Sequence, residues 1–474
     1  MSLNAAIQNA VFAHFPHDPT AGQREACSAM ADFLYSPDPR SAFVLRGYAG
    51  TGKTTLVSAL IKAAPAMRLN TVLLAPTGRA AKVLSGYSGR TALTIHKKIY
   101  MTVTDASGAV RMARAINRHA YTLFIVDEAS MIGLDGGMGR RNLLDDLVDY
   151  VYDGNHCRLM LIGDTAQLPP VGAAESPALD YGHLEAAENL TLFHYELTEV
   201  VRQQAVSGIL RNATSLRNSI ASLAGSDSVS LPLFDIKDCP DVVRLGGDDI
   251  MDTINRHYAV RDLEEVAVVC RSNKRANLYN QGIRNQVLLR DEEVGAGDFL
   301  MVVKNNYFWL DADSPMGFIA NGDIVEVLAV RNRQDLYGFR FADATLRFVD
   351  YDDQPTLDCK LLLGTLHSEA PALTADESQR LFDAVMEDYA DLPNKADRLR
   401  QLRANPYFNA LQIKFSYALT CHKTQGGQWR NIFVDQGFFV DDMLDREYLR
   451  WLYTAFTRAT DKVYLIGFAD EFFA

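Results

Sequence analysis

The chain has 474 residues, of which 48% are hydrophobic and 22% are charged, as in a globular protein of roughly two to four domains. The net charge of −12 argues against a basic protein that passively coats nucleic acid, but not against a motor that holds one strand in a local positive groove. No apolar run approaches the roughly 20 residues that cross a bilayer, and the N-terminus lacks a signal-peptide pattern, so we expect a cytoplasmic protein without a membrane partner.

The spacing of the cysteines argues against two common kinds of site. None of the six cysteines belongs to a C-x-x-C pair, and no group of cysteine and histidine has zinc-site spacing. We therefore expect reduced thiols, without a disulfide framework or a structural metal.

The first third of the chain alternates short apolar runs with helix-like stretches, which predicts a parallel α/β sheet. Each run ends in a glycine, proline or acidic cluster, where open α/β sheets place their ligands. Residues 101–111 differ, because two alternating segments flank the polar stretch 105–108, and this pattern predicts a β-hairpin. The predicted strands of the sheet are 42–46, 71–75, 121–126 and 158–163.

A phosphate-binding loop follows the first strand and precedes the helical stretch 54–64, which is the context that the motif G-x-x-x-x-G-K-[ST] requires. Its glycines let backbone N–H groups surround an anion at a helix N-terminus. We expect Lys53 to contact the β- and γ-phosphates and the Thr54 hydroxyl to bind Mg²⁺. The residues that we expect to hold the nucleotide here are Gly47, Gly50, Thr51, Gly52, Lys53, Thr54 and Thr55.

An acidic pair, Asp127 and Glu128, ends the apolar strand 121–126. Asp127 suits a direct or indirect Mg²⁺ contact, and Glu128 suits the base that activates water. Such a pair is usually only a solvated turn, but the phosphate loop favours the catalytic interpretation. These residues alone predict a Mg²⁺-dependent nucleoside triphosphatase.

The second half repeats the α/β pattern without another phosphate loop. Its predicted strands are 265–270, 413–420, 431–435 and 462–467. Between them the pattern changes to short antiparallel strands and then to a charged helical stretch at 376–403, which predicts an insertion. The predicted strands of the insertion are 325–330, 338–341, 345–349 and 357–363.

Several further strings, in order from residue 19 to 459, resemble the motifs of superfamily 1 helicases of the RecD/Dda group, and most closely the compact phage Dda type. Thr424 departs from the usual Ser or Ala. The strings are Pro19-Thr20-Ala21-Gly22-Gln23, Ala75-Pro76-Thr77-Gly78-Arg79-Ala80-Ala81, Thr94-Ile95-His96, Asp127-Glu128-Ala129-Ser130-Met131, Leu161-Ile162-Gly163-Asp164-Thr165-Ala166-Gln167-Leu168-Pro169-Pro170-Val171-Gly172, Leu197-Thr198-Glu199-Val200-Val201-Arg202-Gln203, Tyr417-Ala418-Leu419-Thr420-Cys421-His422-Lys423-Thr424-Gln425-Gly426 and Tyr453-Thr454-Ala455-Phe456-Thr457-Arg458-Ala459.

The resemblance implies an α/β fold with two RecA-like domains of the P-loop NTPase type. The first would carry a small β-hairpin insertion that splits the duplex, and the second an SH3-like β insertion with a helical arm. The implied boundaries are 1–96 and 120–190 for the first RecA-like domain, 97–119 for the hairpin, 191–298 and 410–474 for the second RecA-like domain, and 299–409 for the insertion.

The resemblance also implies that ATP lies between the two RecA-like domains. Gln167 would then sense the γ-phosphate, and Arg202 and Arg458 would stabilise charge on the transferred phosphoryl group. The alternative for each arginine is a surface ion pair, and it is more plausible for Arg202 than for Arg458. Gln23 would contact adenine, although a glutamine at a helix start is often only a capping partner.

The DNA strand is expected to cross both domains, held by sequence-independent phosphate contacts. Among the expected contacts, His96 and His422 could equally be packed residues at helix starts. The aromatic run 307–309 could stack on bases, but a place in the core is more usual. The expected DNA contacts are Pro76, Thr77, Thr94, His96, Thr420, His422 and Lys423.

The resemblance to the RecD/Dda group implies an ATP- and Mg²⁺-dependent 5′-3′ DNA helicase or translocase, and we expect it to function as a monomer. Its partners would be single-stranded DNA, junctions with duplex, and replication or recombination proteins of a bacterial or phage-infected cell, where it would associate with the nucleoid. The alternatives are a translocase that displaces bound proteins, a motor subunit of a recombination or repair nuclease complex, and an RNA helicase.

Overall fold

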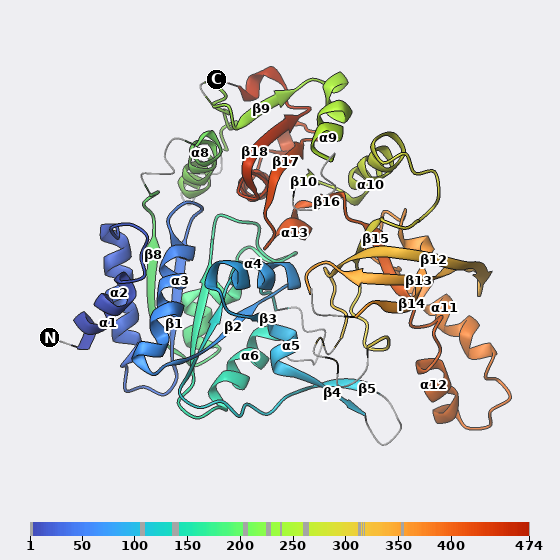
Figure 1. Cartoon of the computed structure of the whole chain (residues 1–474), viewed down its shortest axis with the longest axis horizontal. Coiled ribbons are helices and arrows are strands. Elements are labelled where there is room, and N and C mark those ends of the chain that lie inside the picture. The colour runs from blue at the N-terminus through green and yellow to red at the C-terminus, as the bar shows by residue number, and fades with distance from the viewer. Residues whose placement is uncertain are drawn as a thin grey trace.

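The computed structural model contains two parallel sheets, a closed barrel and a small hairpin (Figure 1). Each sheet with its helices is called a lobe below. The residues that the structure describes are 3–104, 110–134, 142–201, 207–223, 229–237, 239–258, 265–310, 314, 316, 318–351 and 355–473.

The first lobe is built on a six-stranded sheet of order β3-β2-β6-β7-β1-β8, in which all neighbouring strands are parallel. Its central strands are buried on both faces, which explains their nearly continuous apolar sequence. The strands are β1 Ser41–Gly47, β2 Asn70–Ala75, β3 Ala92–Thr94, β6 Thr122–Val126, β7 Arg158–Gly163 and β8 Thr191–Leu197. The helices are α1 Leu3–Phe12, α2 Ala21–Leu34, α3 Lys53–Ala63, α4 Gly78–Ser88, α5 Ile95–Ile99, α6 Leu143–Tyr152 and α7 Tyr181–Ala186.

The second lobe is built on a five-stranded parallel sheet of order β16-β10-β17-β18-β9. The predicted fold class, with two parallel-sheet lobes, is therefore confirmed. The strands are β9 Val242–Leu245, β10 Val266–Cys270, β16 Ala418–Thr420, β17 Trp429–Asp435 and β18 Ala459–Ile466. The helices are α8 Gly208–Ser222, α9 Ile250–Tyr258, α10 Asn273–Gly282, α13 Cys421–Thr424 and α14 Arg446–Phe456.

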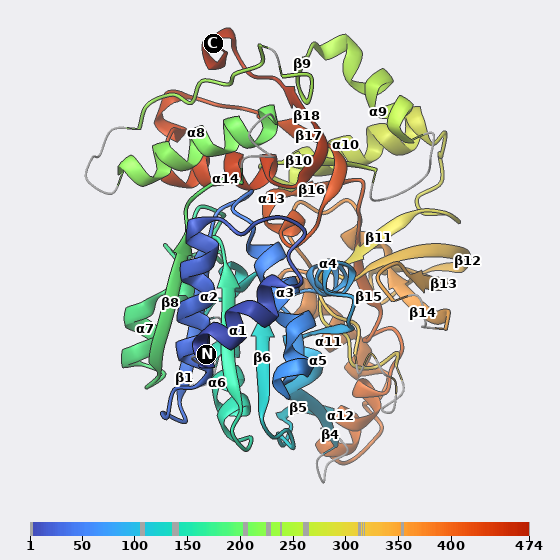
Figure 2. The same cartoon turned by 60° about the vertical axis from the view of Figure 1, so that its left-hand side comes forward.

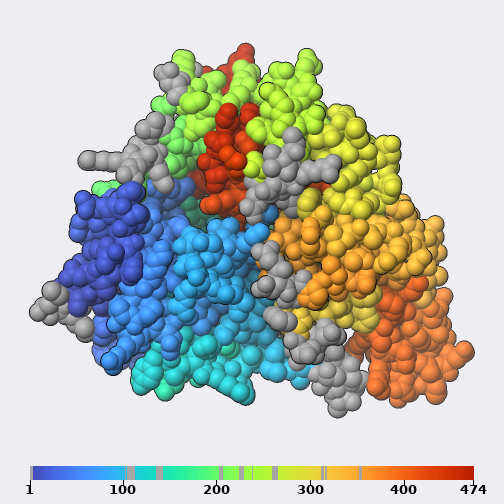
Figure 3. Space-filling model, viewed as in Figure 1, coloured from blue at the N-terminus to red at the C-terminus, as the bar shows by residue number. Residues whose placement is uncertain are grey.

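A closed barrel of five strands interrupts the second lobe, and two helices form an arm that packs on it. The apolar side of the arm contacts Phe341 and Leu362 of the barrel. In Figure 3 the orange barrel and arm lie directly beside the blue first lobe. The strands are β11 Phe299–Val302, β12 Ile324–Leu336, β13 Phe339–Phe348, β14 Leu357–Leu362 and β15 Leu411–Phe415, and the arm helices are α11 Ala375–Glu387 and α12 Lys395–Arg403.

The sequence prediction was wrong in two details of this region. The predicted strand 413–420 is two strands, since β15 closes the barrel whereas β16 joins the sheet of the second lobe. The predicted strands 338–341 and 345–349 are one strand, β13, which pairs with a long, bulged β12. The likeness of the barrel to SH3 domains and the domain boundaries stay predictions.

The predicted hairpin is confirmed as an antiparallel pair, β4 Tyr100–Thr104 with β5 Val110–Arg114. Its predicted tip at 105–108 lies outside the described residues. All six cysteines are free and buried. Within the described ranges, every helix is too short or too polar to span a bilayer.

Candidate nucleotide and nucleic-acid site

The phosphate loop joins β1 to α3 and faces the second lobe (Figure 2). Gly50 and Gly52 have φ angles of 77° and 81°, a left-handed conformation that side chains with a Cβ rarely adopt. The Lys53 ammonium group donates to the backbone carbonyls of Gly47 and, at 2.9 Å, of Tyr48. The loop is therefore folded around the lysine that the sequence assigned to phosphate binding.

The acidic pair follows β6 directly. The Asp127 carboxylate accepts hydrogen bonds from the Tyr87 hydroxyl at 2.7 Å and from the Glu128 backbone at 2.8 Å. Burial, and then the neighbouring Glu128 charge, raise the pKa of Asp127 to about 6. Glu128 has a φ of 53°, a strained conformation that costs about 1–3 kcal/mol and is typical of functional sites.

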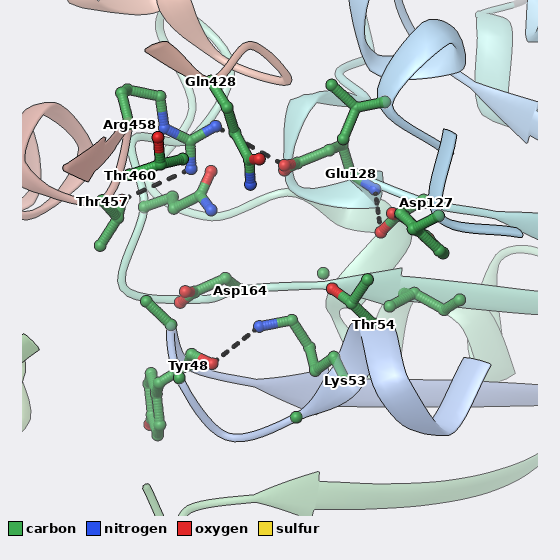
Figure 4. A pocket seen from close by; sticks show the side chains of 18 of the residues that line it. Tyr48, Lys53, Thr54, Asp127, Glu128, Asp164, Gln428, Thr457, Arg458 and Thr460 are labelled. Atoms are coloured by element: carbon green, nitrogen blue, oxygen red, sulfur yellow. Dashed lines mark hydrogen bonds and ion pairs between the residues drawn. The ribbon is translucent and has the colours of Figure 1, made fainter. Parts of the chain in front are cut away.

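A cavity of about 1100 Å³ lies between the two lobes and brings most of the predicted catalytic residues together. Arg458 enters it from the second lobe, and its guanidinium lies 3.7 Å from the Glu128 carboxylate of the first lobe (Figure 4). The predicted residues that line this cavity are Gly50, Gly52, Lys53, Thr54, Thr55, Asp127, Glu128, Gln167 and Arg458.

Arg458 is buried and held by its own lobe. Its guanidinium donates to the carbonyls of Thr454 and Gly427, each at 3.3 Å. These bonds fix the direction of the side chain toward the cavity, so the surface ion pair considered from the sequence does not describe it. The other predicted arginine, Arg202, lies outside the described residues.

Three residues predicted to bind the nucleotide are not part of the cavity lining: Gly47, Thr51 and Gln23. Gln23 forms a capping box with Thr20 at the start of α2, and its side-chain oxygen accepts the Thr20 N–H at 2.9 Å. Its amide nitrogen lies against Gly52, because a Cβ built on that glycine would come within 2.3 Å of it. The capping role is therefore present, and the adenine contact stays a prediction.

The oxygen atoms of Thr54 and Asp127 fit a Mg²⁺ site, because both residues line the cavity beside the phosphate loop. In the described part of the chain, no group of three or more His, Cys, Asp or Glu residues could hold a metal by itself. Mg²⁺ commonly uses one or two carboxylates, several waters and the phosphates of its substrate, so a sparse set of protein ligands suits it.

Sequence reasoning missed a hydrogen-bonded bridge between the lobes. The Tyr453 hydroxyl, on α14 of the second lobe, accepts the Ala49 N–H of the phosphate loop at 2.8 Å. The same hydroxyl donates to the buried Asp164 carboxylate after β7 at 2.6 Å. Both residues lie in strings that resemble helicase motifs, and that was the only signal in the sequence that could have found them.

A second contact lies beside this bridge. The Leu168 N–H donates to the Thr454 hydroxyl at 2.8 Å, and the Gln425 amide donates to the Leu168 carbonyl at 2.6 Å. The segment after β7 is thus tied to two separate parts of the second lobe. A movement of one lobe against the other would therefore have to change or break these hydrogen bonds.

The predicted DNA contacts on the first lobe lie at the starts of two helices. The hydroxyls of Thr77 and Thr94 cap α4 and α5, each accepting a backbone N–H at 3.2 Å. Pro76 and His96 are half-buried, and burial lowers the pKa of His96. Because both hydroxyls already act as caps, their contact with DNA stays a prediction.

The predicted DNA contacts on the second lobe lie at α13, close to α4. Thr420 caps α13 without a side-chain hydrogen bond, and His422 and Lys423 are half-buried within the helix. Burial lowers the pKa of Lys423 to about 8. Gly426 has a φ of 73°, and a Cβ there would lie 2.6 Å from the Ala80 Cβ. The segment that follows α13 therefore lies against the first turn of α4, although no described contact tests whether DNA binds there.

The fold and the cavity define a two-lobed P-loop nucleoside triphosphatase. Two family models match the chain: the AAA domain over residues 19–226 and the UvrD-like helicase C-terminal domain over residues 415–466. The chain is thus similar to DNA helicases of the RecD/Dda group.

Two curated relatives are helicases. The ATP-dependent RecD2 DNA helicase of Deinococcus radiodurans is 27% identical over 436 residues, which are 90% of this chain and 47% of that protein. The ATP-dependent DNA helicase dda of Enterobacteria phage T4 is 26% identical over 322 residues, 66% of this chain and 67% of that protein. The chain thus spans about half the length of the RecD2 relative.

The fold is also similar to that of a solved Pif1 helicase from Bacteroides in complex with ADP-AlF3 and ssDNA. The identity is 15% and the TM-score 0.46, with 96% of this chain and 94% of that chain covered.

Proposed function

We propose that this protein hydrolyses ATP between its lobes to move 5′ to 3′ along single-stranded DNA and to separate duplex. The observation that carries the proposal is the contact of Arg458 with Glu128 across the cavity, because it joins a cation of one lobe to the carboxylate of the other lobe that we expect to act as the base. A nucleotide that needs both groups favours the closed arrangement, which couples hydrolysis to domain motion.

The roles of the residues follow from their chemistry. Lys53 and the N–H groups of the loop bind phosphate oxygens, and Thr54 and Asp127 would hold Mg²⁺, which would neutralise phosphate charge. Glu128 orients a water and accepts its proton as the water oxygen attacks the γ-phosphorus. The bond from that phosphorus to the bridging oxygen breaks, and ADP leaves. Arg458 and Gln167 lie where they can stabilise the charge on the transferred group.

The experiment that tests the proposal compares unwinding of matched duplexes with a 5′ or a 3′ single-stranded tail. We expect ATP-dependent strand separation of the 5′-tailed duplex only. The Glu128→Gln variant is the matched control and should separate neither. Unwinding of the 3′-tailed duplex alone would contradict the polarity, and ATPase stimulation by poly(U) but not by poly(dT) would contradict the choice of DNA.

The Tyr453 bridge makes a separate prediction about coupling. Tyr453→Phe leaves the Ala49 N–H and the Asp164 carboxylate without their shared partner, at a cost of about 1–3 kcal/mol for each buried group. Since both bonds span the lobes, the closed arrangement should be disfavoured. We expect the stimulation of ATPase activity by DNA to fall by roughly thirtyfold or more, which corresponds to the lower end of the combined cost.

The matched control is Tyr448→Phe, on the same helix, because the hydroxyl of Tyr448 accepts a hydrogen bond from the Gln436 amide of its own lobe at 3.0 Å, and no described residue of the first lobe bonds to it. It should keep the DNA stimulation of the unmodified chain. Equal stimulation in both variants would mean that the Tyr453 bridge does not take part in coupling.

A further inference from the structure

A second cavity lies between the barrel and the arm, away from the nucleotide. It has a volume of about 770 Å³ and lies between the segment 304–308, which follows β11, and the helices α11 and α12. None of the residues assigned to nucleotide or DNA binding lines it. We call it the arm pocket.

The charge of the arm pocket is opposite to that of the whole chain. Three exposed cations line it, Lys304, Arg400 and Arg403, and no aspartate or glutamate does, although the net charge of the chain is −12. Among the described residues, none of the three cations forms an ion pair with a carboxylate. These cations are thus available to an anionic ligand, which phosphate groups would supply.

Aromatic rings and amides form the rest of the wall. Tyr307 has an exposed fraction of 38%, and Phe308 and Phe408 beside it are half-buried. The prediction that the run 307–309 belongs to the core is therefore wrong for Tyr307. Side-chain amides such as those of Asn305 and Gln379 also line the pocket and can bond to base edges. Aromatic faces interleaved with cations and amides are the surface that binds single strands without sequence preference.

The arm pocket lies next to the predicted path of the strand. The ring of His96 is 6.3 Å from that of Phe318, which is 5.0 Å from that of Tyr307. His96 also contacts Tyr100, the first residue of the hairpin strand β4, at 5.6 Å between rings. Figures 1 and 2 both place the arm and the β4–β5 hairpin at the same end of the molecule.

We propose that the arm pocket is a second binding site for single-stranded nucleic acid, which holds nucleotides that emerge beside the hairpin. Arg400, Arg403 and Lys304 contact phosphates, while Tyr307 and Phe308 stack on bases. This inference rests on the proposed function, since a motor that separates strands produces a single strand at this end. The charges and the aromatic rings of the arm pocket, rather than its shape, indicate that its ligand is single-stranded nucleic acid.

The test measures binding of fluorescent oligothymidylates of two lengths, about 8 nucleotides, which fill one groove, and about 20, which reach beyond it. The variant combines Arg400→Ala with Arg403→Ala. We expect its affinity for the long strand to fall roughly tenfold and its affinity for the short strand to stay unchanged. The slope of log K against log salt should fall by about 1.4 for the long strand, or about 0.7 for each lost phosphate contact.

Lys395→Ala is the matched control, because Lys395 is an exposed cation of α12 that does not line the pocket. It should change neither affinity. Tyr307→Ala removes a ring from the opposite wall and should also weaken only the long strand. Unchanged binding of the long strand by both pocket variants, at every salt concentration, would overturn the proposal.

The failure of this inference can be told apart from failure of the proposed function. DNA-stimulated ATPase activity tests the motor and should be retained in all these variants, which also shows that they fold. A chain without DNA-stimulated ATPase activity would refute the motor. If the pocket variants still lost affinity for the long strand but not for the short strand, the pocket would be identified all the same. If the chain shows this ATPase activity but both pocket variants bind the long strand as tightly as the control variant does, only the pocket is refuted.

Discussion

Replacing Arg458 with alanine should lower the kcat of ATP hydrolysis by about 10³- to 10⁵-fold, the range found for arginines that act on a transferred phosphoryl group. The carbonyls of Gly427 and Thr454 hold this guanidinium in the cavity, 3.7 Å from the Glu128 carboxylate. Since the phosphate loop lies wholly on the first lobe, nucleotide binding should largely persist. Steady-state ATPase activity, measured beside equilibrium binding of a fluorescent ATP analogue, separates the two effects.

Arg430→Ala is the matched control for this variant. Arg430 belongs to the same lobe and pairs with Glu265 at 3.0 Å, but it is exposed and outside the cavity. An exposed ion pair is screened by water and contributes little to stability, so activity should be unchanged. Arg458→Lys should not restore turnover, because an ammonium group lacks the planar fork of a guanidinium. A kcat within tenfold of the unmodified chain in Arg458→Ala would show that this arginine does not stabilise the transferred group.

The sequence predicted those parts of the site that depend on short, contiguous strings. The phosphate loop and the acidic pair each follow a buried strand, so the local pattern placed Lys53 and Asp127 correctly at the carboxyl edge of one sheet. That edge faces Arg458 only because the second lobe packs against it. A string can indicate the arginine, but the distance across the cavity depends on packing between lobes.

The missed contacts have a common physical reason. The Tyr87 hydroxyl bonds to Asp127 across 40 positions of the chain, and Tyr453 bonds to Asp164 across 289. Pairs so far apart in sequence leave no periodic pattern, and a buried tyrosine looks the same whether its hydroxyl serves a site or only the core. The capping box of Gln23 shows the reverse case, since a local pattern can satisfy a side chain that was assigned to a ligand.

The split strand shows another limit of pattern reasoning. Residues 411–420 are apolar over most of their length, as expected of a buried parallel strand. The chain leaves the barrel after Phe415 and enters the sheet of the second lobe at Ala418. Both environments bury the strand on two faces, so hydrophobicity does not mark the change between them.

Replacing Lys53 with alanine should reduce ATP turnover by about 10²- to 10³-fold, because a fixed cation is lost where charge develops on the phosphates. The affinity for nucleotide should fall as well, which distinguishes this variant from Arg458→Ala. Lys62→Ala is the matched control, since Lys62 is an exposed lysine in the last turn of the same helix. ATPase activity and analogue binding, checked against thermal unfolding, measure the effect, and turnover close to that of Lys62→Ala would contradict the assignment.

The two variants together test whether the lobes act on one phosphoryl group. Lys53 and Arg458 line the same cavity from opposite lobes. If both contact the same transition state, removing the second after the first should cost much less than removing it alone, because groups that act as a unit are strongly non-additive. Strictly multiplicative losses in the double variant would mean that the two cations act in separate steps. Non-additive losses of activity would instead indicate that hydrolysis takes place in the cavity between the lobes. There a change in the nucleotide can move one lobe against the other.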